Sequence, residues 1–254
     1  MVPMLSPEND RPRLGCALAI VAKLPHAGAC KTRLVPPLDL EQAAALSRCF
    51  ISDTMRNIVL ATTHHRAHAA ALYTPAADER SLREAFGEAA AYVVQRGGDL
   101  GERLSSGIDD LFGLGYESVC VIDSDSPTVP TIFLEHAIRA LEEPGDRVVL
   151  GPAADGGYYL LGVKRRHPEL FERVTWSTSR VYEQTVARAA AAGLEVESLP
   201  RWYDVDDGAA LALLTREFET GEPSGGFFAP ATRAFMSGGA HRRVRPAFAA
   251  AEAG

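Results

Sequence analysis

The sequence predicts one α/β domain with a mostly parallel sheet and helices on both of its faces. Two observations carry this prediction. Short apolar runs alternate along the chain with longer segments of helical periodicity, and 254 residues with 46% hydrophobic content can bury a single large core. Strands that alternate with helices favour crossover units, in which each helix covers a face of a parallel sheet. We expect residues 14–220 to form this domain, residues 1–13 to be a flexible N-terminus and residues 221–254 to be a peripheral or disordered tail.

The apolar pattern gives the expected elements in order. Strands are expected where short apolar runs are bounded by polar, glycine or proline residues, at 16–22, 67–73, 90–95, 118–122, 147–150, 158–161 and 194–199. Helices are expected where apolar residues recur every three or four positions, at 39–61, 99–112, 131–141, 179–191 and 208–218. The residues Asp99 and Asp207 immediately precede two of these helical patterns and are expected to be N-caps.

Composition restricts the class of protein. A net charge of −7 argues against a non-specific nucleic-acid binder, because such proteins are usually basic. Four cysteines without a C-x-x-C pair predict neither a zinc site nor a disulfide framework, which favours a reducing, cytoplasmic location. No apolar stretch approaches the ~20 residues that span a bilayer. We therefore expect small-molecule partners rather than nucleic acid or membrane, and the sequence leaves the oligomeric state open.

An acidic triplet, Asp123-Ser124-Asp125, follows the expected strand 118–122 directly. In open α/β sheets, ligands bind at the carboxyl ends of strands. Carboxylates placed there attract Mg²⁺ or Mn²⁺, which in turn carries phosphate oxygens. The alternative interpretation is an ordinary turn, because Asp, Ser and the following Pro127 are common in turns.

A cationic loop follows the first expected strand, with Lys23, Lys31 and Arg33 as its three cations. Gly28 shapes the loop, whose backbone amides could form an anion nest. Lys31 as a point charge and Arg33 as a bidentate fork could hold a triphosphate. The loop matches neither a Walker loop nor G-x-G-x-x-G. The alternative is a solvated basic loop.

A second acidic segment, Asp204-Val205-Asp206-Asp207, follows the last expected strand. Strand alternation places Asp204 and Asp206 on one side if the backbone stays extended. With Asp207 taken as the helix cap, Asp206 is the better candidate to complete a metal site with Asp125.

Three further segments could contact a nucleotide or an acceptor. Gly98, Asp99 and Arg103 lie at a strand-to-helix junction that suits a loop over a nucleotide. The candidate acceptor-binding residues are Asp155, Gly156, Gly157, Tyr158, Trp176, Ser177 and Thr178. Paired glycines let backbone approach a ligand closely, although a Gly-Gly hairpin turn explains Gly156-Gly157 equally well. Ser177 could likewise be a plain N-cap.

Five motifs, taken in order, resemble the DUF2064 family, which is similar to 2-phospho-lactate guanylyltransferase. They are A-K-x-P-x-x-G-x-x-K-T-R-L from Ala22, G-D-L-G-x-R-L from Gly98, D-S-D-S-P from Asp123, G-P-A-x-D-G-G-Y from Gly151 and D-V-D from Asp204. The resemblance covers about residues 15–220 and implies the nucleotide-diphospho-sugar transferase fold, also called glycosyltransferase-A-like. Relatives often carry glycine where Asp123 stands, which makes Asp123 a less favoured metal ligand than Asp125. In the second acidic segment, Asp204 is less favoured than Asp206.

Two transferase activities and one binding role are compatible with this pattern. The favoured hypothesis is a metal-dependent nucleotidylyltransferase that joins a nucleoside monophosphate to a small phosphorylated or phosphonate acceptor and releases pyrophosphate. Asp125 and Asp206 would hold Mg²⁺ or Mn²⁺, while Lys31 and Arg33 would neutralise the pyrophosphate. The alternative is a glycosyltransferase that uses Asp123-Ser124-Asp125 as a D-x-D motif on a nucleotide-sugar, with Asp155 as the candidate base. A non-catalytic nucleotide-binding protein is the third possibility.

Overall fold

A seven-stranded sheet forms the centre of the protein, whose computed structural model describes residues 13–221 and 225–238. The strand order is β3-β2-β1-β4-β6-β5-β7. The strands are β1 (Leu14–Lys23), β2 (Ala67–Thr74), β3 (Ala91–Val94), β4 (Tyr116–Asp123), β5 (Arg147–Pro152), β6 (Tyr158–Val163) and β7 (Glu195–Ser198). Only β6 runs antiparallel to its neighbours β4 and β5 among these strands. The predicted mostly parallel sheet is therefore confirmed.

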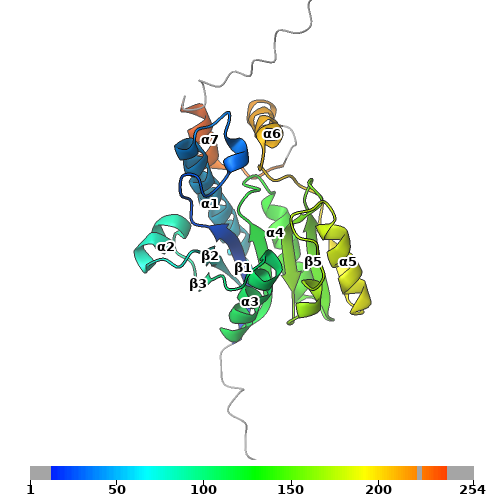
Figure 1. Ribbon diagram of the computed structural model, residues 1–254. Helices are drawn as coiled ribbons and strands as arrows, with labels where there is room; N and C mark the ends of the chain where they lie inside the picture. The colour runs from blue at the N-terminus through cyan, green and yellow to red at the C-terminus, as the bar shows by residue number, and fades with distance from the viewer. Residues whose placement is uncertain (1–12, 222–224, 239–254) are drawn as a thin grey trace, which may run out of the picture.

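Helices cover both faces of this sheet (Figure 1). They are α1 (Leu40–Thr62), α2 (Glu79–Phe86), α3 (Leu100–Gly113), α4 (Thr131–Glu142), α5 (Val181–Ala191), α6 (Gly208–Thr220) and α7 (Pro230–Ser237), with short 3₁₀ turns η2 (Thr32–Leu34) and η3 (Pro168–Leu170). Alternate residues of β1 point to opposite faces: Leu18 and Ile20 pack with α1 and α4, whereas Ala17 and Ala19 pack with α3. Both layers of the core thus meet at β1.

Aspartates begin three of the helices that frame the strand ends. The carboxylate of Asp39 accepts from Gln42 N at 2.7 Å, that of Asp99 from Glu102 N at 2.8 Å and that of Asp207 from Ala210 N at 2.9 Å. Each bond satisfies an amide at a helix start that has no partner within the helix. The predicted N-cap roles of Asp99 and Asp207 are confirmed.

Two helices were not expected from the sequence. Helix α2 is short and buries only Leu82 and Phe86, so it offers little periodicity to detect. Helix α7 lies in the expected peripheral tail, but it packs against α1. Part of the expected tail thus packs on the domain, and the boundary at residue 220 stays a prediction, while 1–12, 222–224 and 239–254 lie outside the described residues. No helix in the described ranges is long and apolar enough to cross a bilayer.

Candidate active site

The carboxyl ends of β1 and β4 meet at the centre of the sheet. Val21 of β1 pairs with Asp123 of β4, which brings the cationic loop next to the acidic triplet. From β1 the chain first adds β2 and β3 on one side, and then returns to place β4 on the other. Such a reversal of strand order opens a crevice where α/β proteins bind ligands. The backbone N–H of Val205 donates to the carbonyl of Asp125 at 2.8 Å, so the second acidic segment reaches the same crevice.

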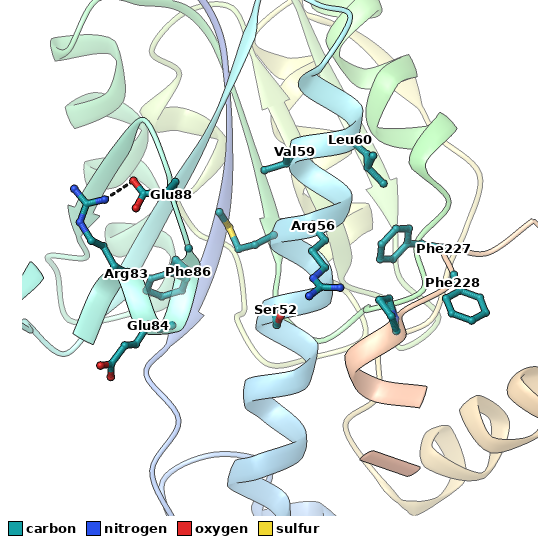
Figure 2. A pocket seen from close by; sticks show the side chains of 14 residues that line it. Ser52, Arg56, Val59, Leu60, Arg83, Glu84, Phe86, Glu88, Phe227 and Phe228 are labelled. Carbon is teal, nitrogen blue, oxygen red and sulfur yellow. Dashed lines mark hydrogen bonds and ion pairs between the residues drawn. The ribbon is translucent and has the colours of Figure 1, made fainter. Parts of the chain in front are cut away.

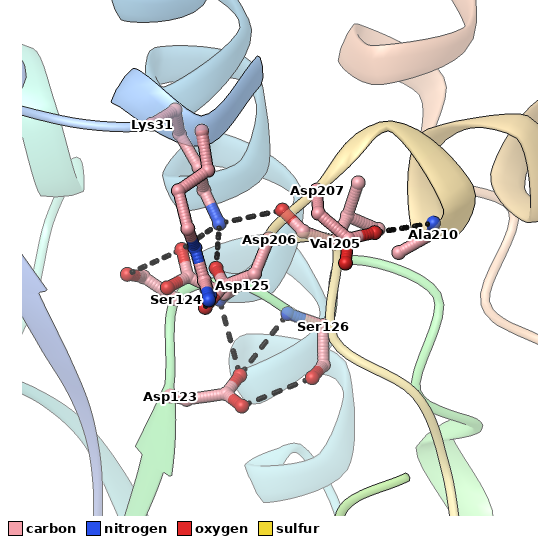
Figure 3. Close-up of polar contacts among 10 residues, drawn as sticks. Lys31, Asp123, Ser124, Asp125, Ser126, Val205, Asp206, Asp207 and Ala210 are labelled. Carbon is pink, nitrogen blue, oxygen red and sulfur yellow. Dashed lines mark hydrogen bonds and ion pairs between the residues drawn. The ribbon is translucent and has the colours of Figure 1, made fainter. Parts of the chain in front are cut away.

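Asp123 and Asp125 have different roles within the triplet. The carboxylate of Asp123 accepts from the N–H groups of Asp125 and Ser126, both at 3.1 Å, and from the Ser126 hydroxyl at 3.0 Å (Figure 3). Burial and the nearby charges of Asp125 and Asp204 raise the pKa of Asp123 well above its usual range. Asp123 therefore holds the turn together, as the turn interpretation predicted for it, while Asp125 faces the second acidic segment.

Lys31 joins the two predicted metal ligands. Its Nζ lies 2.7 Å from Asp125 Oδ1 and 2.9 Å from Asp206 Oδ1, and donates to the carbonyl of Val205 at 2.8 Å (Figure 3). Only 4% of the Lys31 side chain is exposed. Burial by itself would lower the pKa of Lys31, but the charges of Asp125 and Asp206 outweigh it and raise that pKa. Lys31 is thus a buried, charged link between the three segments.

Arg33 completes the cluster from the solvent side. Its guanidinium lies 2.6 Å from Asp206 Oδ2, and 68% of its side chain is exposed. Burial would raise the pKa of Asp206, but the charges of Lys31 and Arg33 outweigh it and lower that pKa. Asp206 is therefore ionised, and Arg33 keeps donors free to meet an incoming anion.

A buried polar network fixes the second acidic segment to α6. Trp202 Nε1 donates to the Thr128 hydroxyl at 3.2 Å, and that hydroxyl lies 3.1 Å from Glu217 Oε2. The Tyr203 hydroxyl donates to the same carboxylate. Burial raises the pKa of Glu217 despite these hydrogen bonds. The network holds the backbone on either side of Asp206, which positions this side chain beside Lys31.

The predicted binding residues divide into two adjoining pockets. A pocket of about 350 Å³ is lined by the cationic side chains Lys23, Lys31, Arg33 and Arg103, together with Asp125 and Asp206. A pocket of about 540 Å³ is lined by Asp123, Asp155, Gly157, Tyr158, Trp176, Ser177, Thr178, Asp204 and Asp206. Arg33, Leu100 and Asp206 border both. The first pocket is rich in cations and the second in carboxylates, and burial with the charges of Asp155 and Asp206 raises the pKa of Asp204 to about 6.

Four predicted residues lie outside both pockets and shape their walls. Gly28 and Gly156 have φ values of 75° and 92° and form turns, Gly98 donates its N–H to Glu102 at 2.7 Å, and Asp99 caps α3. A side chain at Gly156 would also collide with the backbone of Ser179, because its Cβ would lie 2.1 Å from the Ser179 carbonyl oxygen. These residues support the site through the backbone, so a role in ligand contact stays a prediction.

Sequence reasoning missed Leu100 and Ser47. Leu100 is 40% exposed and lines both pockets. Ser47 reaches the cationic pocket from α1. Neither residue carries a signal in the sequence, because their place depends on how distant elements pack.

A cavity larger than either of these two pockets lies elsewhere. It measures about 710 Å³ and is formed by α1, α2 and residues 227–230, with Val59, Leu60 and Phe228 among its apolar walls (Figure 2). It shares no lining residue with the two pockets at the strand ends. None of the residues predicted for the site lines it.

The close packing of Trp176 against Gly101 of α3 can be tested by a substitution that adds one methyl group. A Cβ at Gly101 would lie 2.6 Å from Trp176 Nε1, so Gly101→Ala should push the indole toward the acidic pocket. We expect a shift in tryptophan emission with a loss of stability of about 1 kcal/mol or less, because the indole borders an open pocket. The shift should be absent when the same substitution is made together with Trp176→Phe, which leaves Trp202 as the control fluorophore. An unchanged emission in Gly101→Ala would contradict this packing.

The donor set suits a hard divalent cation, but the position is filled by Lys31. Asp125 Oδ1, Asp206 Oδ1 and the Val205 carbonyl converge on one point, and oxygens are the ligands that Mg²⁺ prefers. Their distances of 2.7–2.9 Å to Nζ are those of hydrogen bonds rather than metal bonds. Within residues 13–221 and 225–238, no group of three or more His, Cys, Asp or Glu is arranged to hold a metal. A metal could use these oxygens only after Lys31 moves.

The comparisons with known proteins agree with this fold. Residues 57–178 match DUF2064. That family is described as an uncharacterized protein conserved in bacteria. The resemblance found in the sequence is thereby confirmed. The DUF2064 match includes the acidic triplet and the glycine segments, while Lys31, Arg33 and Asp206 lie outside it. No curated protein matches the chain.

Two solved structures are similar to this chain. The first is a "putative nucleotide-diphospho-sugar transferase" from Desulfovibrio desulfuricans G20, with 28% identity, a TM-score of 0.76 and coverage of 91% of this chain and 98% of the other. The second is CMP:2-keto-3-deoxy-manno-octonic acid synthetase complexed with CTP, with 14% identity, a TM-score of 0.50 and coverage of 80% and 99%. The fold is that of the nucleotide-diphospho-sugar transferases, as predicted.

Proposed function

We propose that this protein is a nucleotidylyltransferase that transfers a nucleoside monophosphate from a nucleoside triphosphate to a small acceptor. An oxygen of the acceptor attacks the α-phosphorus, the bond from that phosphorus to the leaving oxygen breaks, and pyrophosphate departs. A phosphate or phosphonate acceptor is already anionic, so no general base is required. Such an acceptor needs a counter-charge in the carboxylate-lined second pocket, which Arg33 at the border of both pockets and a bound metal would supply. The chemistry depends mainly on alignment and on neutralising charge.

One observation carries the proposal: a cationic pocket at the carboxyl ends of β1 and β4 adjoins a second pocket of acceptor size. Lys23, Arg33 and Arg103 line the first, which suits the dense charge of a triphosphate. Asp206 and Arg33 border both pockets, so the α-phosphorus of a bound nucleotide would lie at their junction. A Mg²⁺ ion held by Asp125 and Asp206 would supply further neutralisation of phosphate oxygens.

Glycosyl transfer is the second candidate, because one structural neighbour is named as a transferase of nucleotide-diphospho-sugars. It would use Asp123 and Asp125 as a D-x-D pair. In this chain, however, the carboxylate of Asp123 is occupied by the turn amides and the Ser126 hydroxyl. This weakens the D-x-D interpretation and favours nucleotidyl transfer.

A pyrophosphate assay separates the candidates. The full chain is incubated with each nucleoside triphosphate, Mg²⁺ and a panel of phosphorylated and phosphonate acceptors. We expect pyrophosphate release that depends on both nucleotide and acceptor. Turnover of a nucleotide-sugar without such release would support glycosyl transfer instead. Nucleotide binding without turnover of either substrate across the panel would contradict both.

A further inference from the structure

Lys31 has no donor left for a phosphate in this structure. An ammonium group has three N–H donors and no acceptor. All three have protein partners, namely Asp125 Oδ1, Asp206 Oδ1 and the Val205 carbonyl. The ring of Phe50 covers the group, with its centroid 5.3 Å from Nζ. Lys31 therefore cannot hold a triphosphate, as its sequence context predicted, without giving up at least one of these bonds.

The same ammonium blocks the oxygens that a divalent ion would use. A Mg²⁺ ion binds oxygen at about 2.0–2.1 Å, so it would occupy the space that Nζ now fills. Contact between a divalent cation and the singly charged ammonium is unfavourable even in a partly solvated site. The lysine and the metal are therefore alternatives at this point, and occupation by one excludes the other.

A polyphosphate bound in the cationic pocket could draw the Lys31 ammonium away from Asp125 and Asp206. Lys31 lines that pocket beside Arg33 and Arg103, so a polyphosphate bound there lies within its reach. The Lys31 backbone has φ 50° and ψ 33°, a left-handed conformation that is unfavourable for a non-glycine residue. The side-chain contacts of Lys31 help to hold the loop in this form, together with the hydrogen bond from the Leu34 N–H to the Lys31 carbonyl at 2.9 Å.

We propose that Lys31 is the resident counter-ion of Asp125 and Asp206, and that it excludes divalent metal until a polyphosphate takes over the ammonium. Nucleotide then binds first, and the freed carboxylates accept the metal. The part that concerns polyphosphate rests on the proposed function, whereas the competition between lysine and metal does not. Lys31 is a positioning residue in this scheme, since it decides when the carboxylates become available.

Metal binding without nucleotide tests the competition. The full chain is titrated with Mn²⁺ and followed by electron paramagnetic resonance. We expect Lys31→Met to bind Mn²⁺ about tenfold more tightly than the wild type, because the competing charge is gone. Lys31→Met/Asp125→Asn should lose this gain, and Lys164→Met, a remote lysine bonded to a backbone carbonyl, should not change the affinity. Equal or weaker Mn²⁺ binding by folded Lys31→Met would overturn the proposal.

A measurement on the wild type guards against misfolding of the variant. Acetylation of each lysine by a dilute anhydride is followed by mass spectrometry. Lys31 should react slowly, because its ammonium is buried and fully bonded, and saturating Mn²⁺ should accelerate its reaction at least about fivefold. Lys164 should react at the same rate with and without metal. The Mn²⁺ concentration is one at which electron paramagnetic resonance shows the Asp125-dependent site of the wild type to be filled, so an unchanged rate at Lys31 would show that lysine and metal do not compete.

Inorganic tripolyphosphate in a metal chelator tests the transfer of the ammonium. The comparison is between wild type and Lys31→Met/Asp125→Asn, which has the same net charge. If Lys31 moves to the phosphates, the double variant should bind tripolyphosphate about tenfold more weakly by calorimetry. Equal affinities would overturn this part of the proposal. Success here combined with no pyrophosphate release from any acceptor would instead count against the proposed function alone.

Discussion

Asp125→Asn is expected to lower acceptor-dependent pyrophosphate release at least about 100-fold while the fold is retained. The substitution keeps the size of the side chain but removes its charge. Lys31 then keeps only Asp206 as an ionised partner, and a metal loses one of two anionic ligands. The rate of pyrophosphate release under saturating nucleotide and Mg²⁺ is the measurement.

The size of this effect contrasts with a small effect on stability. The Asp125 side chain is 36% exposed, and its carbonyl bond to Val205 does not involve the carboxylate. Lys31 is buried but keeps Asp206 and the Val205 carbonyl as partners, so we expect the free energy of unfolding to fall by only about 1–2 kcal/mol. Asp109→Asn is a matched control on α3, where Asp109 forms a surface pair with Arg166 far from both pockets, and it should retain wild-type activity. Asp125→Asn with more than a tenth of wild-type activity would refute the role of this carboxylate.

The sheet and its main helices could be predicted because their signals are local. Strand β1 alternates between two buried faces, and α3 shows a single apolar face with an aspartate cap, so short windows of sequence suffice. Helix α2 was not predicted, because its eight residues bury only Leu82 and Phe86. Helix α7 was not predicted, because it packs against α1, which is distant from it in the sequence.

The sequence indicates which residues to consider for the candidate site, but not which of their side chains contact one another. Lys31, Asp125 and Asp206, which the sequence places after strands, lie together in one crevice of the structure, and their role in a site stays a prediction. Their bonding could not be read from the sequence, because Lys31 and Asp206 are 175 residues apart. A cation expected to meet a phosphate meets two carboxylates instead. The difference between Asp123 and Asp125 likewise depends on which side chain turns back to the amides of the loop.

The separation of charge between the two pockets follows from the same topology. The end of β1, the loop after it and the first turn of α3 bring the cations, whereas β4, the turn at Asp155 and the segment before α6 bring carboxylates. Asp206 stands at the border and is held by cations from one side only. A polyphosphate is therefore favoured on one side of this residue and disfavoured on the other, which gives a bound nucleotide a single direction.

Asp53→Ala is expected to destabilise the protein by about 3 kcal/mol, the largest effect on folding that we predict. Asp53 of α1 is fully buried, with 0% exposed, and its carboxylate accepts from Ala231 N at 3.0 Å, Thr232 N at 2.7 Å and the Thr232 hydroxyl at 2.7 Å. It thus caps the N-terminus of α7 from another helix. Alanine would leave these donors buried without an acceptor, at the positive end of the helix dipole. Urea unfolding followed by circular dichroism measures the loss.

The series of variants at this contact distinguishes its contributions. Asp53→Asn keeps one acceptor oxygen and should cost less than alanine, while Thr232→Ala removes a single donor and should cost about 1 kcal/mol. Hydrogen exchange at Ala231 and Thr232 should accelerate most in Asp53→Ala, because α7 then detaches before the sheet unfolds. A loss below 1 kcal/mol in Asp53→Ala would mean that α7 contributes little to the domain. A loss near 3 kcal/mol would place residues 230–237 within the folding unit, beyond the boundary at residue 220 that the sequence predicts.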